Sequence, residues 1–155
     1  MLYVKSSVNF LFVLILLITS CGYQPIYINK NPDNFKFKNI TLNGNKEINR
    51  KIISALSIEK DESSANLNKS LILDSYIKVV ETSKDSKGKV TTYKSIGEVN
   101  LIIEEKGKSL KNKKFTEDFT YNNYDNKFDL VEYQKEVETI IINKIIEEIN
   151  IYLNL

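Results

Sequence analysis

Apolar and polar residues alternate along the middle of the chain, as they do in β-strands. Three runs with a period of two predict strands over Lys69–Ser83, Lys89–Glu104 and Lys111–Tyr121. The segments between them, Asp85–Gly88 and Lys106–Lys108, contain glycine and other turn-forming residues, so consecutive strands should pair antiparallel. The pattern therefore predicts a three-stranded meander.

An earlier strand is predicted over Phe35–Leu42, where the alternation changes phase partway along, as a β-bulge would cause. Asn43–Asn45 should follow as a turn. Residues Lys46–Leu56 place apolar side chains three and four positions apart, which predicts a short amphipathic helix. Ser57–Asn68 is mainly polar, so we expect a loop between this helix and the meander.

A second helix of about 25 residues is predicted from Asp129, with Asp129 as its amino-terminal cap. Its polar residues form one narrow stripe: Glu132, Glu136, Thr139, Asn143, Glu147 and Asn150. The remaining apolar arc is roughly twice the 100° that a helix resting on one sheet needs. The excess predicts a second contact, for which the two candidates are the helix Lys46–Leu56 and another protein.

The elements follow the order strand, helix, strand, strand, strand, helix. In a strand–helix–strand unit the crossover is almost always right-handed and leaves the two strands parallel. The predicted fold is therefore an α+β domain, residues 35–155, with a mixed four-stranded sheet and two helices packed on one face. A chain of this length can form one domain with a substantial core.

The amino-terminal segment resembles an export signal. Lys5 and the free amino terminus precede nine apolar residues, Phe10–Ile18, and two small residues then lead to Cys21. A transmembrane helix needs about 20 apolar residues, so this run is too short for a stable span. Ile18–Cys21 resembles the lipobox of bacterial lipoprotein precursors. That resemblance implies a signal peptide over residues 1–20, a lipidated Cys21, and a lipidated terminus and tether over residues 21–34.

The alternative is an ordinary secreted protein with one stray thiol. We favour lipidation because an unpaired thiol is a liability in an oxidising compartment, and because lipidation accounts for the position of Cys21. Each buried methylene of an acyl chain contributes about 0.8 kcal/mol, so several chains form a firm anchor. Gly22 stands where an aspartate would imply retention at the inner membrane. The lipoprotein resemblance therefore implies the outer membrane, with the domain on its periplasmic side.

Composition excludes several classes of function. The chain has no histidine and a single cysteine, so it can form neither a Cys/His metal cluster nor a Ser-His-Asp triad. Its net charge of +2 does not indicate a nucleic-acid binder. An enzyme that uses two carboxylates is the remaining catalytic possibility, but no spacing singles out a pair. We expect no enzyme activity and no cofactor.

The element order, the amino-terminal string Cys21–Tyr27 and the stretch from Tyr121 through Tyr133 resemble the LptE family of lipopolysaccharide-assembly lipoproteins. This resemblance implies a non-enzymatic protein that plugs and helps assemble an LptD-like β-barrel, and so aids lipopolysaccharide insertion into the outer leaflet. The implied partners are this barrel, lipopolysaccharide and the membrane, through the lipid anchor. The alternative is a freestanding lipoprotein, such as a pilotin or a barrel-assembly accessory.

Two lysine clusters are candidate sites for phosphorylated lipopolysaccharide head groups, because clustered lysines attract phosphate. The topology predicts that the Asp85–Gly88 turn lies at the pole far from the lipid, and this turn carries Lys84, Lys87 and Lys89. A second cluster lies around the other turn: Lys106, Lys108, Lys111, Lys113 and Lys114. A solvated, solubilising turn is the alternative for both clusters. We expect the first cluster to matter more.

Overall fold

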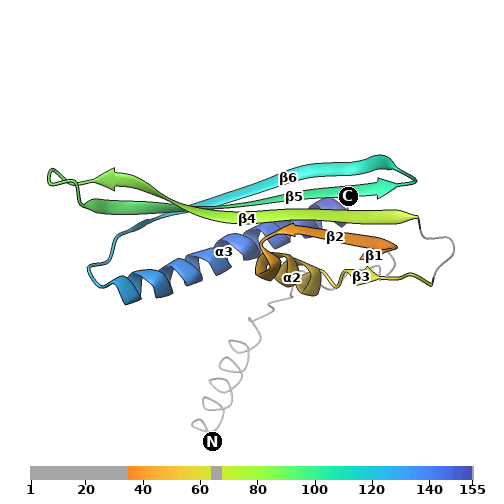
Figure 1. The fold of residues 1–155 in the computed structure, drawn as a ribbon, viewed down its shortest axis with the longest axis horizontal. Helices are drawn as coiled ribbons and strands as arrows, with labels where there is room; N and C mark the ends of the chain where they lie inside the picture. The colour runs from red at the N-terminus through yellow and green to blue at the C-terminus, as the bar shows by residue number, and fades with distance from the viewer. Residues whose placement is uncertain (1–34, 64–67, 155) are drawn as a thin grey trace, which may run out of the picture. The chain divides into compact units, whose positions relative to one another are not determined.

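The computed structural model describes residues 35–63 and 68–154 (Figure 1). A four-stranded sheet forms one layer, and two helices lie together on one of its faces. The strands lie in the order β2 (Asn39–Gly44), β4 (Lys69–Lys84), β5 (Val90–Glu105) and β6 (Lys108–Asn122). The helices are α2 (Lys46–Ala55) and α3 (Lys127–Asn154). The predicted α+β fold is confirmed.

Strand β2 pairs parallel to β4, whereas β4, β5 and β6 pair antiparallel, so the sheet is mixed as predicted. Alternate side chains point to the helices and form the core. On β4 these include Leu71 and Leu73, and on β5 they include Val99 and Leu101, all fully buried. The other face of the sheet carries no helix among the described residues (Figure 1), and we call it the open face.

The first predicted strand is interrupted. Its beginning forms β1 (Lys36–Phe37), which pairs parallel with β3 (Glu59–Lys60) in a separate two-stranded sheet. The phase change therefore marks a boundary between two strands, and the expectation of a single bulged strand is wrong. The expected loop Ser57–Asn68 likewise contains β3. The physical reason is a change of backbone partner: the carbonyl oxygen of Phe37 accepts the N–H of Asp61 at 2.9 Å, whereas Lys38 donates to the carbonyl oxygen of Lys69 at 2.8 Å. Phe37 itself is 1% exposed in the core.

The connection from β2 to α2 is tighter than a three-residue turn. Gly44 is still paired with Ser75, and its φ of +75° favours glycine. A side chain at Gly44 would also collide with the carbonyl oxygen of Ser75. Asn45 then caps α2, because its Oδ1 accepts the backbone N–H groups of Glu47 and Ile48 at 2.9 and 3.2 Å.

Helix α3 begins two residues earlier than predicted. The Oδ1 of Asn126 accepts the backbone N–H of Phe128 at 2.9 Å, so Asn126 supplies the capping oxygen. Asp129 lies inside the first turn, where its carboxylate accepts a hydrogen bond from the side chain of Asn126. The expectation that Asp129 is the cap is wrong, although an acidic residue in this turn still favours the helix.

The helix layer is complete under only part of the sheet. Helix α2 has 10 residues and α3 has 28, so α2 lies beside only part of the sheet, close to the point where β2 ends (Figure 1). We call the end of the sheet that contains β2 the near half; it comprises β1, β2, α2, β4 as far as Ser75, the β5–β6 turn and the end of α3. The far half comprises β4 from Tyr76 to Lys84, the turn to β5 and the beginning of α3. Within the described residues, no helix is long and apolar enough to cross a membrane.

A row of tyrosines fills the space between the sheet and the beginning of α3. Tyr93 on β5 stacks on Tyr121 of β6, with 6.0 Å between the ring centroids. Tyr133 on α3 contacts Tyr121 edge-on at 5.6 Å and Tyr124 at 5.4 Å. Further along α3 the helix comes much closer to the sheet, where a side chain at Gly97 would meet the Cγ2 of Ile141. The helix therefore diverges from the sheet toward the far half.

Candidate functional site

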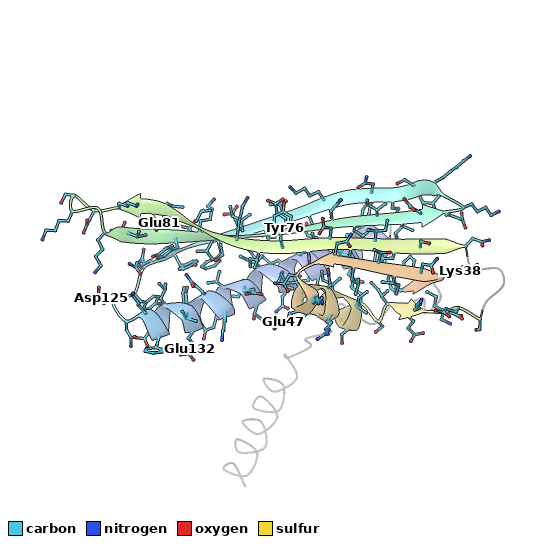
Figure 2. All side chains as sticks on the ribbon, in the orientation of Figure 1. Lys38, Glu47, Tyr76, Glu81, Asp125 and Glu132 are labelled. Carbon is cyan, nitrogen blue, oxygen red and sulfur yellow. The ribbon has the colours of Figure 1, made fainter. Side chains whose placement is uncertain are left out.

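The first lysine cluster, which consists of Lys84, Lys87 and Lys89, lies at the β4–β5 turn, as predicted, and we call it the far cluster. Its charges are partly neutralised by neighbouring carboxylates. Lys84 forms an ion pair with Glu81, with 2.9 Å between Nζ and Oε2. Lys89 reaches Asp125, in the link between β6 and α3, at 2.7 Å (Figure 2). Asp125 raises the pKa of Lys89, and Lys89 lowers the pKa of Asp125. Lys87 forms no ion pair with the described residues.

The Lys89–Asp125 pair fastens the β4–β5 turn to the start of α3. It borders a small hollow of about 220 Å³ whose wall also includes Asp85 and Asn123. Two carboxylates in this wall disfavour an anionic ligand inside the hollow. The turn can therefore attract phosphate mainly through Lys87 and through the outer surface of Lys84 and Lys89.

The second lysine cluster is divided by its strand. Lys111 donates to the carbonyl oxygen of Tyr152 at 3.0 Å and so caps the end of α3. Lys113 lies over the rings of Phe115 and Tyr152, at 4.7 and 5.2 Å from their centroids. These two lysines join β6 to α3. Lys106 and Lys108 remain exposed at the β5–β6 turn, and Lys114 points to the open face.

A cluster of paired charges lies at the centre of the open face, around Glu98 of β5. This side chain is 8% exposed, although no helix covers the open face. The hydroxyl of Tyr76 donates to Glu98 at 2.6 Å, Lys114 forms an ion pair with the same carboxylate oxygen, and Lys78 lies 3.6 Å from the other. Strands β4 and β6 thus supply three partners for one carboxylate. We call this group the Glu98 cluster.

The Glu98 cluster keeps its carboxylate ionised. The ion pair with Lys114 and the hydrogen bond from Tyr76 lower the pKa of Glu98 to about 2. The same contacts raise the pKa of Lys114 and of Tyr76. Glu98 compensates only one of the two lysine charges, so the cluster has no unpaired carboxylate and keeps a surplus of positive charge. The polar contacts of the Glu98 side chain among the described residues are two lysines and one tyrosine, a set that suits a contact surface.

The Glu98 cluster was not predicted from the sequence. Glu98 shares the parity of Asn100 and Glu104, so alternation alone indicates that it points outward. Its partners become visible only when the register places Tyr76 directly opposite Glu98. A tyrosine and a carboxylate at facing positions of two predicted strands were the available signal.

A hollow among the described residues lies in the near half, at the end of α3. Its volume is about 490 Å³, and its apolar wall includes Phe37, Ile103 and Leu110. Lys69 and Lys111 lie at its rim. Lys111 already caps α3, so one cation is largely committed to structure. Cys21, the predicted lipidation site, lies outside the described residues, as do the predicted signal peptide and tether.

No protein-family model matches the chain, and no curated protein matches it. Solved structures do. Rare lipoprotein B from Shewanella oneidensis aligns with a TM-score of 0.50 and 16% identity, over 71% of this chain and 86% of that one. A minor lipoprotein from Acinetobacter baumannii aligns with a TM-score of 0.52 and 17% identity, over 77% and 90%. Lipoprotein B from Nitrosomonas europaea gives 0.56 and 9%, over 74% and 79%.

These similarities extend over most of each chain, at low sequence identity. They show that the chain shares its fold with proteins described as lipoproteins, one of which is rare lipoprotein B.

Proposed function

We propose that this chain is an outer-membrane lipoprotein that plugs and helps assemble an LptD-like β-barrel, and so aids lipopolysaccharide insertion into the outer leaflet. The observation that carries the proposal is the shared fold with rare lipoprotein B, a member of the LptE family. The lipobox-like sequence that ends at Cys21 supports the lipid anchor. The domain would then lie on the periplasmic side of the outer membrane, with a structural role.

The described surface supports a contact role as well. Ten large apolar side chains are exposed, among them Phe128 at 86% and Ile151 at 60%. The excess apolar arc of α3 is therefore covered only in part by α2, and both helix ends keep apolar side chains at the surface. A domain enclosed by a partner can carry such side chains without the cost they impose on a free protein. The Glu98 cluster, whose carboxylate is fully paired, is likewise compatible with a contact surface.

Affinity purification tests this proposal. The full-length chain with a carboxy-terminal tag is isolated from outer membranes in mild detergent, and the co-purifying proteins are identified by mass spectrometry. We expect one large β-barrel in about equal amount. Recovery of the lipoprotein alone would contradict the plug role and favour the freestanding module.

A matched variant tests the anchor. Cys21→Ser removes the sulfur that lipidation needs and leaves the domain unchanged. We expect the wild-type protein to begin at Cys21 and to carry acyl mass, whereas the variant should lose both the acyl mass and its outer-membrane fraction. Equal membrane recovery of the two proteins would contradict lipid anchoring.

A further inference from the structure

Among the described residues, one strand position in the sheet has no occupant. Strand β2 ends at Gly44, opposite Ser75 of β4, but β4 continues to Lys84 (Figure 1). From Tyr76 onward, β4 pairs with β5 on one edge and with no described strand on the other. A segment placed in line with β2 would complete the sheet there. We call this place the β4 vacancy.

The backbone at the β4 vacancy is ready to pair. The carbonyl oxygens of Lys69 and Ser75 accept backbone N–H groups from Lys38 and Asn45, so these odd-numbered residues turn their polar groups toward the β2 edge. Backbone groups alternate in direction along a strand, so Ile77 and Val79 present their N–H and C=O groups to the same edge. An unpaired row of this kind is the template for adding a strand.

The side chains around the β4 vacancy are apolar and exposed on both faces. Toward the helices, Leu73 is fully buried, whereas Val79, on the same side of the same strand, is 47% exposed. On the open face, Tyr76 and Val80 are 43% and 36% exposed. These differences arise where β2 and α2 end. An added strand would cover side chains on both faces at once.

Helix α3 shows the same change along its length. Val131 is 51% exposed, whereas Ile142, three turns later on nearly the same side of the helix, is 1% exposed. Side chains on the helix face of an added strand would therefore contact apolar side chains of β4. They would lie beyond the end of α2, in space that α2 does not cover.

The chemistry on the two faces defines the occupant. The helix face offers Ile77 and Val79, which favour apolar side chains. The open face offers Lys78, which shares Glu98 with the closer Lys114 and so keeps attraction for another carboxylate. The complementary segment is extended and alternates apolar with polar or acidic residues. This is recognition by strand addition, in which backbone bonds supply affinity and alternate side chains supply specificity.

We propose that the β4 vacancy receives an extended loop or terminal segment of the partner β-barrel. The inference rests on the proposed function, from which the barrel comes. Wall strands of a closed barrel are already paired on both edges, so they cannot supply the added strand. A loop or terminus of the barrel has free backbone groups and meets the requirement.

Two substitutions of Val79 test the proposal in full-length tagged protein purified from outer membranes. Val79→Pro removes the outward N–H and blocks strand addition, yet proline is tolerated at a strand edge because that N–H is not bonded to β5. Val79→Thr keeps the N–H and the branched shape. We expect the proline variant to recover about fivefold less barrel or lower still, as the loss of about one hydrogen bond predicts, and the threonine variant to recover near wild-type amounts.

The outcomes separate this inference from the proposed function. If wild-type protein recovers a barrel and Val79→Pro recovers it equally, strand addition is wrong and the plug role stands. If wild-type protein recovers no barrel, the proposed function fails, and this inference fails with it. Equal losses of recovered barrel in Val79→Pro and Val79→Thr would indicate an apolar contact without backbone pairing. That result would also overturn strand addition.

A second measurement covers the case in which Val79→Pro fails to fold, which circular dichroism of the purified variant would reveal. A photo-crosslinking amino acid at Val79 should couple to a loop or terminal segment of the barrel, as mapped by mass spectrometry. The same group at Leu110, exposed on β6 in the near half, serves as the control. Coupling at Val79 to a second copy of this chain, or to a barrel wall strand, would contradict the proposal.

Discussion

The two halves of the molecule solve the same packing problem differently. In the near half, β2 and α2 complete the sheet and the helix layer, and Leu71, Leu73 and Ile52 are fully buried between them. In the far half, β4 loses its neighbour on one edge and α3 diverges, so tyrosines fill the space and apolar side chains remain exposed. The near half therefore holds the fold, and the far half is left available for contacts.

The difference also shows how a single strand can serve both purposes. β4 has the same apolar alternation in each half, but its environment changes at Ser75. Burial depends on what covers the strand as well as on its sequence.

Shortening one side chain in each half of β4 should separate the halves most clearly. Leu73→Ala removes a fully buried side chain and should lower the free energy of unfolding by about 2–5 kcal/mol. Val79→Ala removes a half-exposed side chain and should cost about 0.5 kcal/mol. Urea unfolding of both variants measures the difference. Equal costs would show that the far half carries as much core as the near half.

An added methyl group where α3 packs on Gly97 of β5 should destabilise the fold. Gly97→Ala would place Cβ 2.5 Å from the Cγ2 of Ile141, a stiff branched side chain. Alanine is normally better than glycine in a strand, but here we expect a loss of about 1–3 kcal/mol from overpacking.

A double-mutant cycle identifies the cause of that loss. In the Ile141→Ala background the clashing methyl is absent, so Gly97→Ala should cost less by at least about 0.5 kcal/mol. Additive effects in urea unfolding would mean that strain at Gly97 does not come from Ile141.

The tyrosine row should stabilise the far half through its ring contacts. Tyr133→Leu keeps apolar bulk but removes contacts with Tyr121 and Tyr124, so it should cost about 1–2 kcal/mol. Tyr124→Leu is the matched control, because this ring is 41% exposed and contacts Tyr133 alone among the described rings. Thermal unfolding should show the larger loss for Tyr133→Leu. The opposite ranking would show that the row does not support α3.

The meander and both helices were predictable because they depend on local signals. Alternation in β4, β5 and β6 and the turn residues between them indicate the strands without knowledge of their neighbours. The pairing of β1 with β3 was missed because two residues carry too little periodicity to register as a strand. The β4 vacancy was missed for another reason: it depends on where β2 ends beside β4, and Gly44 indicates a turn without revealing which strand it leaves unpaired.

In the candidate site, too, the features set by local sequence were predicted and those set by distant residues were not. The lysines of the far cluster were placed correctly at the β4–β5 turn, because a turn and its flanks are local. Their pairing with Glu81 and Asp125 was not foreseen, since Asp125 comes from a link 36 residues after Lys89. The Glu98 cluster depends on three strands in register and on no local signal at all.

The Glu98 cluster should make stability depend on acid. Its folded pKa of about 2 lies below the model-peptide value of 4.5, so the carboxylate binds protons more weakly in the folded chain. The stabilising effect is therefore complete above about pH 4.5 and is lost as the pH falls from there toward about 2. Glu98→Gln has no titratable group at this position. The wild type should therefore lose stability toward that of the variant as the pH falls through this window. Urea midpoints measured across the window test this, and parallel curves would contradict it.

The smallest expected effect on stability belongs to the far lysine cluster. Lys84, Lys87 and Lys89 are exposed, and the ion pairs of Lys84 and Lys89 are screened by solvent, so changing all three to serine should leave the domain folded. If the cluster attracts lipopolysaccharide phosphates, the triple variant should bind purified lipopolysaccharide about five- to tenfold more weakly at low salt. Changing Lys106 and Lys108, at the other turn, is the control. Unaltered binding by the triple variant would remove the far cluster as a phosphate site.

Within the far cluster the three lysines should not contribute equally. Lys84 and Lys89 already hold carboxylates, which offset part of their attraction for phosphate, whereas Lys87 forms no ion pair in the described part of the chain. Lys87→Ser alone should therefore produce most of the loss seen in the triple variant. A larger loss from Lys89→Ser would mean that the Lys89–Asp125 pair opens when lipopolysaccharide binds. In that case lipopolysaccharide would break the contact that joins the β4–β5 turn to the start of α3. The far half would then change its conformation on binding, while the near half holds the fold.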